Sequence, residues 1–357
     1  MLIDIRGISP GASMFRSTLK WLGIALVALL LVVLAGGGTY QWVATNNDLT
    51  RYPPPGKLID VKTRMMHIHC QGTGTPTVVV EQGLGGLSLA WQEIHHRIAE
   101  LTRVCSYDRA GMGYSEPIGH PTRAPEVAER LYLLLQGADI SDDLVLVGWS
   151  AGGVYIREFF GAYPDQVKAM VFVDSSHEQQ GGRLPELEQS GDSGFLRLAR
   201  YLAPVGLLRI SGVVRRHFDN VPLGDELREQ LLALYHQSHA VGTLLDASTA
   251  FEQDTNSPNP PDSLGDLPLI VLSQGKPVEL SNEMPPNVTL QYLQESREVW
   301  NQLQIELASL SSSGSRIIAA ESGHRIHSDQ PDLLVDAVDK LVQVVRKTNS
   351  ASDPLEQ

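Results

Sequence analysis

The chain has few of the residues that mark metal centres or nucleic-acid binding. Among its 357 residues there are only two cysteines, Cys70 and Cys105, and they lack metal-type spacing. Four histidines show no metal-ligand pattern: His67, His69, His95 and His96. No run of lysine or arginine is long, and the formal net charge is −13, so we expect no nucleic-acid partner. No repeat occurs at a solenoid period, which argues against a repeat array.

What the sequence does contain is typical of a globular protein. Hydrophobic residues make up 42% of it and charged residues 19%, which is far from the composition of disordered chains. A chain of this length can form one large domain or two modest ones.

Residues 21–38 form the one long apolar run, and they carry no charge. Such a run is just long enough to cross a bilayer core of about 30 Å. Basic residues precede it and aromatic residues follow it: Arg6, Arg16 and Lys20, then Tyr40 and Trp42. This pattern predicts that residues 1–42 are a short cytoplasmic segment and a transmembrane anchor, with the rest of the chain exported. The alternative is a cleaved signal peptide that ends in the small residues 35–38. Residues 43–56, rich in asparagine and proline, are predicted to be a linker.

Strand and helix patterns then alternate. Strands are predicted at 57–61, 64–70, 77–81, 103–107, 144–147, 167–173, 267–272 and 316–320. Helices are predicted at 89–101, 124–137, 154–163, 295–310 and 333–345. Alternation of this kind predicts a mostly parallel sheet covered by helices on both faces, with an antiparallel hairpin at one edge.

The alternation stops between 176 and 262, where only helical patterns occur. We expect these residues to form a helical cap over the functional site, although ordinary surface helices would show the same pattern. The core of the fold is then 57–175 together with 263–347, and 348–357 is a disordered tail.

The stretch Gly148-Trp149-Ser150-Ala151-Gly152 follows a predicted strand and precedes a predicted helix. G-x-S-x-G in this setting is the nucleophile elbow, a strained turn that exposes the serine hydroxyl. The five-residue pattern alone is weak evidence for a catalytic serine, and it becomes stronger only if other loops supply the groups that such a serine needs.

Two other loops follow predicted strands, at Gly83–Gly86 and at His324. Ligands of open α/β sheets bind at the carboxyl ends of the strands, so all three loops are expected to meet. Ser150 needs a base to become a nucleophile, and a histidine serves near neutral pH. The backbone N–H groups of Ala151 and Leu84 are candidates for an oxyanion hole. The glycine loop has a simpler interpretation as a tight turn.

Four segments resemble the α/β-hydrolases, in the order and spacing of that family: 81–86, 107–115, 148–152 and 322–324. The resemblance covers roughly residues 57 to 345 and is greatest to the esterase and aminopeptidase-like branch with a helical cap. It implies an eight-stranded α/β-hydrolase fold with Ser150 as nucleophile and His324 as base. Family members usually carry His-Gly before the oxyanion loop, whereas this chain has Gln82-Gly83; the departure changes a side chain and leaves the backbone donor.

The other triad assignments have rivals. His327 lies three residues after His324, and only one of the two can face Ser150. The family usually places its acid after the strand that is here 267–272, where the loop contains Glu279 and no aspartate. A second family position is the end of the preceding strand, where Asp174 stands. We expect Asp174, with Glu279 as the alternative.

Two further features follow from the resemblance. Asp108 and Arg109 match a loop that buttresses the site, and we expect them to form an internal ion pair or a turn. Cys70 and Cys105 fall on strands that are neighbours in the family's sheet, so in an exported domain they can form a disulfide. Two buried thiols are the alternative.

The sequence thus predicts a membrane-anchored, exported serine hydrolase of small carboxylic esters that needs no metal and no organic cofactor. One alternative is an amidase or peptidase on short peptides, with an acidic cap residue that binds the free amine. The acidic candidates are Glu178, Glu186, Glu188, Asp192, Asp219 and Glu252. Another alternative is a non-catalytic binding protein on the same fold.

Overall fold

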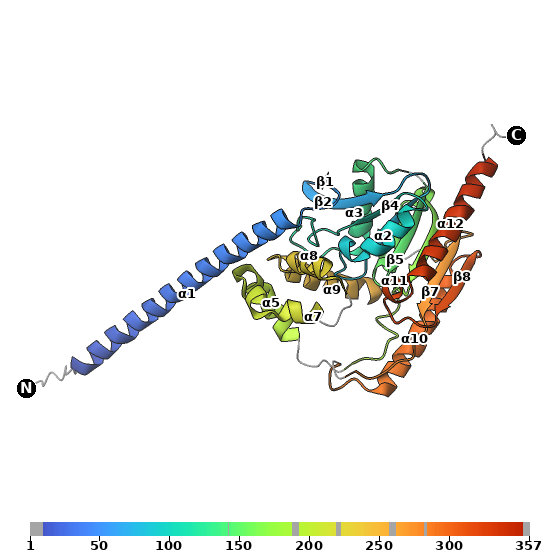
Figure 1. Ribbon diagram of the computed structural model, residues 1–357. Helices are drawn as coiled ribbons and strands as arrows, with labels where there is room; N and C mark the ends of the chain where they lie inside the picture. The colour runs from blue at the N-terminus through green and yellow to red at the C-terminus, as the bar shows by residue number, and fades with distance from the viewer. Residues whose placement is uncertain are drawn as a thin grey trace, which may run out of the picture.

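The computed structural model describes residues 10–141, 143–187, 193–218, 223–256, 262–281 and 284–352. Its centre is a sheet of eight strands that helices cover (Figure 1). The strands are β1 (Lys57–Val61), β2 (Arg64–Gln71), β3 (Thr77–Glu81), β4 (Val104–Tyr107), β5 (Leu144–Trp149), β6 (Val167–Val173), β7 (Leu269–Gln274) and β8 (Gly314–Ala319).

The helices fall into an N-terminal helix, a set on the sheet, and a set between β6 and β7. The first is α1 (Pro10–Arg51). Those on the sheet are α2 (Gln92–Ala99), α3 (Ala124–Gly137), α4 (Gly152–Ala162), α10 (Leu290–Ser309), α11 (Ile326–Asp329) and α12 (Pro331–Ser352). Those between β6 and β7 are α5 (Ser193–Leu202), α6 (Leu207–Ser211), α7 (Val213–Phe218), α8 (Asp225–Tyr235) and α9 (Ala240–Asn256). Short 3-10 turns are η1 (Ser88–Trp91), η2 (Pro164–Gln166) and η3 (Ala203–Val205).

The strand order is β1-β2-β4-β3-β5-β6-β7-β8. The pairs β1/β2 and β2/β4 are antiparallel and all the other pairs are parallel. The expected mostly parallel eight-stranded sheet is therefore confirmed. Because β3, β5, β6, β7 and β8 run in one direction, the loops that follow them gather at one edge.

Both faces of the sheet are packed. Val78 and Val80 of β3 point to the face covered by α2 and α12, and Val79 points to the face covered by α3 and α4. This alternation is the period-2 geometry of a strand, and burial on both faces explains why the central strands are apolar throughout.

The five helices between β6 and β7 occupy the segment for which the sequence predicted a helical cap. They lie together on the side of the molecule where α1 joins it, in yellow and olive in Figure 1. Their buried side chains form two small clusters separate from the sheet core, one of which joins the cap to the loop after β4 through Met112.

Helix α1 is longer than predicted. Residues 43–51, expected to begin a linker, continue the helix as far as Arg51, because they pack against the cap. Asp48 accepts a hydrogen bond from Arg209 at 2.6 Å, and Gln41 donates one to the His236 carbonyl. Tertiary contacts of this kind override weak local helix propensity. From this junction α1 projects away from the body (Figure 1).

The C-terminal segment also differs from its prediction. Residues 348–352, expected in a disordered tail, complete α12, and residues 353–357 lie outside the described residues. The Asn349 side chain donates a hydrogen bond to Asp143 at 2.8 Å, which ties the last turn to the loop before β5.

Cys70 and Cys105 form a disulfide, as the sequence allowed. They are directly opposed on the antiparallel strands β2 and β4, and their Cα atoms are 4.1 Å apart. The bond joins the antiparallel edge of the sheet to its parallel part.

Candidate active site

Ser150 lies in the sharp turn between β5 and α4, and its backbone is in the left-handed region, at φ 54°. A Cβ on Gly152 would lie 2.3 Å from the Glu81 carbonyl oxygen, and one on Gly148 would lie 2.8 Å from the Gly152 carbonyl oxygen. Glycine is therefore required on both sides of the turn for strand and helix to approach this closely. The Ser150 carbonyl accepts a hydrogen bond from Ser176 N at 2.8 Å, which holds the strained turn.

Asp174 lies at the end of the neighbouring strand β6 and contacts His324. Its Oδ2 is 2.7 Å from His324 Nδ1. Its Oδ1 accepts hydrogen bonds from the Gln274 backbone N–H at 3.0 Å and from Trp300 Nε1 at 2.9 Å. The carboxylate is fully buried, so these three contacts replace its hydration. Of the two candidate acids, Asp174 contacts the histidine, whereas Glu279 is exposed.

The His324 ring is oriented by more than the carboxylate. Trp149 Nε1 donates to the His324 carbonyl at 2.9 Å, and the Trp149 and Trp300 rings lie 5.3 and 6.0 Å from the imidazole. The His324 side chain is 42% exposed, so a ligand can reach the ring from solvent. The described residues contain no hydrogen bond between Ser150 Oγ and the imidazole; in unliganded sites this contact often forms only with substrate.

The rival histidine, His327, lies in the wall behind the site. Its ring stacks on Trp91 at 4.2 Å and meets the edge of Trp149 at 4.7 Å. Burial lowers the pKa of His327 to about 3, with smaller contributions from His324 and Arg325. A buried imidazole with so low a pKa is a poor base near neutral pH.

The glycine loop after β3 passes directly over the elbow. A Cβ on Gly83 would lie 2.8 Å from the Trp149 ring and 3.1 Å from Ser150 Cβ. The side chains of Leu84 and Ala151 belong to one cluster, which Phe251 of the cap completes. The two residues whose N–H groups are expected to be oxyanion donors therefore lie close together at the elbow.

Arg109 sets the orientation of this loop. Its guanidinium donates to the Gln82 carbonyl at 2.7 Å and to the Gly83 carbonyl at 2.5 Å, and it pairs with buried Glu81. In a trans peptide the C=O and N–H groups point in opposite directions. Because the Gly83 carbonyl points to Arg109, the N–H of Leu84 in the same peptide points away from it. In the described chain this N–H donates to no protein acceptor, which leaves it open to a ligand.

Burial raises the pKa of Glu81, and the charge of Arg109 and the hydroxyl of Tyr107 oppose that rise. The expected internal ion pair or turn is present, with Glu81 and not Asp108 as the partner of Arg109: Arg109 pairs with buried Glu81, and its carbonyl accepts a hydrogen bond from Met112 N at 2.8 Å in a turn. Asp108 instead contacts His67 Nδ1 at 2.9 Å and accepts from Ser88 N at 2.8 Å. Asp108 and Arg109 therefore contact different parts of the site, because the side chains of consecutive residues at the end of a strand point in opposite directions.

Several contributors were not foreseen from the sequence. Trp300 lies in α10 and Gln274 at the end of β7, and both bind the Asp174 carboxylate. A single tryptophan in a helix does not indicate a role in a site. A backbone N–H donor cannot be predicted from the identity of its side chain. The Gln82 side chain, where the family usually has histidine, is buried, and neither of its polar atoms has a partner within the described residues.

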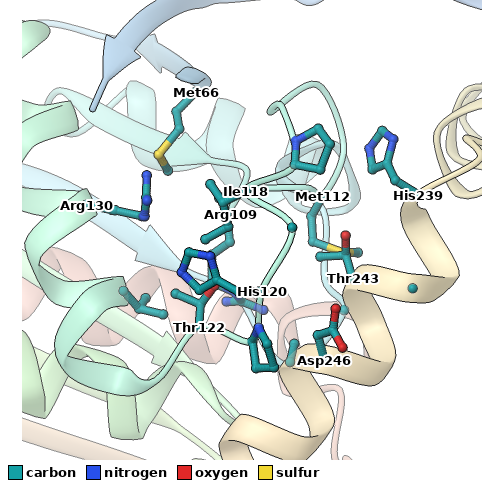
Figure 2. Close-up of a pocket in the computed structure, with 18 of the residues that line it drawn as sticks. Met66, Arg109, Met112, Ile118, His120, Thr122, Arg130, His239, Thr243 and Asp246 are labelled. Carbon is teal, nitrogen blue, oxygen red and sulfur yellow. The ribbon is translucent and has the colours of Figure 1, made fainter. Parts of the chain in front are cut away.

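A cavity of about 440 Å³ lies beside the site, under the cap. Figure 2 shows Thr243 and Asp246 of α9 facing the loop that carries Ile118, His120 and Thr122. Gly85 of the glycine loop and Tyr155 of α4 also line the cavity. Ser150 and His324 do not line the cavity, which therefore adjoins the site without containing it.

The acidic cap residues predicted as candidates for binding an amine find little support. Glu178 is buried and paired with Arg157, while Glu186 and Glu252 are exposed. The remaining candidates lie outside the described residues: Glu188, Asp192 and Asp219.

Comparison with known proteins agrees with this fold. A family model described as the alpha/beta hydrolase family matches residues 68–337. The chain is 32% identical over 212 residues to the uncharacterized protein C23C11.06c of Schizosaccharomyces pombe, a match that covers 56% of this chain and 36% of that protein. It is 30% identical over 189 residues to an uncharacterized vacuolar membrane protein of Saccharomyces cerevisiae, covering 46% of this chain and 29% of the relative.

These matches span only about a third of the length of the two curated relatives. Among solved structures, a thermophilic esterase from Thermogutta terrifontis superimposes with a TM-score of 0.54 at 18% identity, covering 81% of this chain and 98% of the esterase. At that identity the similarity shows the fold alone.

Proposed function

Because this chain belongs to the alpha/beta hydrolase family, we propose that it is a serine hydrolase that cleaves carboxylic esters through an acyl-enzyme. The observation that carries the proposal is the 2.7 Å contact of buried Asp174 with His324, at the sheet edge where Ser150 occupies its strained turn. A carboxylate on Nδ1 leaves Nε2 of the imidazole unprotonated and able to accept the serine proton.

The reaction follows from these positions. His324 Nε2 takes the proton of Ser150 Oγ as the oxygen attacks the ester carbonyl carbon. The carbonyl oxygen becomes negative and is stabilised by the N–H groups of Leu84 and Ala151; in known enzymes each such donor contributes about 3–4 kcal/mol. Collapse of the tetrahedral intermediate breaks the bond to the alkoxy oxygen, which takes the proton from His324 and leaves as the alcohol.

Water completes the cycle. His324 removes a proton from water, the hydroxide attacks the acyl carbon, and Ser150 Oγ leaves with the proton returned by His324. The products are one alcohol and one carboxylic acid, with Ser150 regenerated.

The same proposal includes a location. An N-terminal helix long and apolar enough to cross a membrane, with basic residues before it, supports a single-pass anchor with the hydrolase domain on the extracytoplasmic side. A disulfide in the core is consistent with an oxidising compartment.

The test uses the full chain reconstituted in lipid nanodiscs. It is treated with a fluorophosphonate probe and with p-nitrophenyl esters of graded chain length. We expect labelling and ester hydrolysis by the wild type and neither by Ser150→Ala. If the wild type is folded, as judged by a cooperative thermal transition, yet is neither labelled nor active, the hydrolase proposal is wrong and the fold serves binding instead.

A further inference from the structure

The cap carries an exposed apolar surface that the proposed reaction does not use. Four large side chains within α5 and α6 are between 43% and 72% exposed: Leu198, Tyr201, Leu207 and Ile210. We call these four residues the cap patch. An exposed apolar cluster of this kind marks an interaction surface, whereas apolar side chains scattered singly over a surface need no explanation.

The cap patch lies beside α1, at the end of its apolar run. Gly37 packs against η3 so closely that a Cβ there would lie 2.6 Å from the Val205 carbonyl oxygen. Gly206 meets the Tyr40 ring in the same way, at 2.8 Å. The segment that links α5 to α6 therefore sits at the level of the last apolar turn of α1. Helix α1 contacts η3, the 3-10 turn that follows α5, and Figure 1 shows α5 on the side of the body where α1 joins it.

Polar contacts fix the cap to α1 just beyond the apolar run. Arg209 of α6 donates to Asp48 at 2.6 Å, and the Gln41 side chain donates to the His236 carbonyl at 2.5 Å. The cap cannot slide along α1 without breaking these bonds. The position of the cap patch relative to a membrane is therefore fixed by how far α1 is inserted in that membrane.

We infer that the cap patch docks onto the bilayer that holds α1, with Leu198, Tyr201, Leu207 and Ile210 buried at the level of the headgroups and upper acyl chains. The inference rests on the proposed membrane anchor. The exposed surface of α1 is apolar from Trp21 to Leu34, and η3, which links the two helices of the cap patch, packs on α1 just beyond this surface, at Gly37. Tyrosine is favoured at this depth, and the exposed Arg197 and Arg216 can direct their charges to lipid phosphates.

Docking has a consequence for the substrate. Arg200, next to Tyr201 on α5, lines the cavity beside the elbow. The same short helix therefore forms a wall of the cavity and faces lipid. This places the cavity within reach of an ester whose acyl chains lie in the bilayer, so the favoured substrate class is a membrane-borne lipid ester.

The docking is tested by depth-dependent quenching. Both native cysteines are joined in the disulfide, so a thiol-reactive fluorophore reports only an introduced cysteine. The variants are Tyr201→Cys and Ile210→Cys in the cap patch, Leu29→Cys in α1, and Ile318→Cys, an exposed apolar residue on β8. Each full-length variant is placed in nanodiscs containing phosphatidylcholine brominated on its acyl chains.

We expect loss of fluorescence at Tyr201 and Ile210, as at Leu29, and none at Ile318. If Leu29 is quenched while the cap positions behave as Ile318 does, the cap patch is not docked on lipid and covers a protein surface instead. If Leu29 itself is not quenched, α1 is not inserted in the bilayer, and both the proposed anchor and the docking inference are wrong. None of these outcomes depends on catalysis, so the experiment tests docking even if the chain proves to be inactive.

A second measurement addresses the substrate class. The variant Tyr201→Asp/Ile210→Asp should lose most of its hydrolysis of a long-chain diacylglycerol in the nanodisc and keep the wild-type rate on p-nitrophenyl acetate. Equal losses on both esters, or no loss on either, would overturn the lipid-ester inference.

Discussion

At the scale of single residues, the candidate site combines two strained positions. Ser150 and Asp174 both have positive φ, at 54° and 42°, and they follow the adjacent strands β5 and β6. For residues other than glycine this conformation costs about 1–3 kcal/mol and persists only where surrounding contacts enforce it. The Ser176 N–H on the Ser150 carbonyl and the 2.7 Å bond from Asp174 N to the Leu272 carbonyl are such contacts.

The acid assignment gives a direct prediction. Asp174→Asn should lower kcat about 10⁴-fold, because an amide at this position favours the wrong imidazole tautomer. Glu279→Gln is the matched control and should keep wild-type kcat, since Glu279 is exposed. Steady-state kinetics on a p-nitrophenyl ester measures both. A large loss in the Glu279 variant, with Asp174→Asn nearly active, would reverse the assignment.

Arg109 is predicted to act through the oxyanion loop. Lysine offers one ammonium group, which cannot hold Glu81 and both loop carbonyls as the guanidinium does. Arg109→Lys should therefore lower kcat by about 10–100-fold with little change in KM, because the oxyanion forms only in the transition state.

The control for Arg109 is Arg157→Lys, which disturbs another buried pair, with Glu178, away from the oxyanion loop. It should lower the melting temperature and leave kcat unchanged. Arg109 would be merely structural if its variant lost stability and kept full kcat.

At the scale of elements, Gly37 is a point of close contact in the junction of α1 with the cap. Gly37→Ala should lower the melting temperature in nanodiscs, because the new Cβ meets the Val205 carbonyl at 2.6 Å. Gly36→Ala is the matched neighbour, with no atom within 4 Å of its Cβ, and should be neutral or stabilising because alanine is the better helix former. Equal melting temperatures for the two variants would show that α1 does not pack on the cap.

At the scale of the whole molecule, burial of neutral histidines governs the response to acid. Burial lowers the pKa of six histidines within the described residues: to about 4 for His95, His177 and His236, to about 3 for His327, and below the ordinary value for His69 and His239. In the unfolded chain these histidines have a pKa near 6.5. Between that pH and their lower pKa values in the folded chain, the unfolded chain therefore binds more protons than the folded chain. The free energy of unfolding should therefore be level above about pH 6.5 and fall on acidification, by about 1.4 kcal/mol per pH unit for each such histidine.

His327→Phe tests this dependence. It keeps a ring against Trp91 and should reduce the acid slope by about 1.4 kcal/mol per pH unit below pH 5.5, measured by urea unfolding at a series of pH values. His96→Phe, at an exposed position in α2, is the control and should leave the slope as in the wild type. An unchanged slope in the His327 variant would contradict the prediction.

The order of strands and helices and the elbow around Ser150 were readable from the sequence alone. They depend on local properties: an alternating or continuous apolar pattern, and glycines at a turn that no other residue can occupy. The helices of the cap were readable for the same reason, as a stretch with helical spacing and no strand.

Tertiary structure decided the remaining features. Only the folded chain brings Asp174 into contact with His324 and leaves Glu279 exposed, and only the folded chain buries His327 while His324 stays accessible. The end of α1 was set by its contacts with the cap, at Gly37 and Asp48, where local propensity favoured a linker. Each of these outcomes is a contact between segments far apart in the chain, and such contacts leave no periodic trace in the sequence.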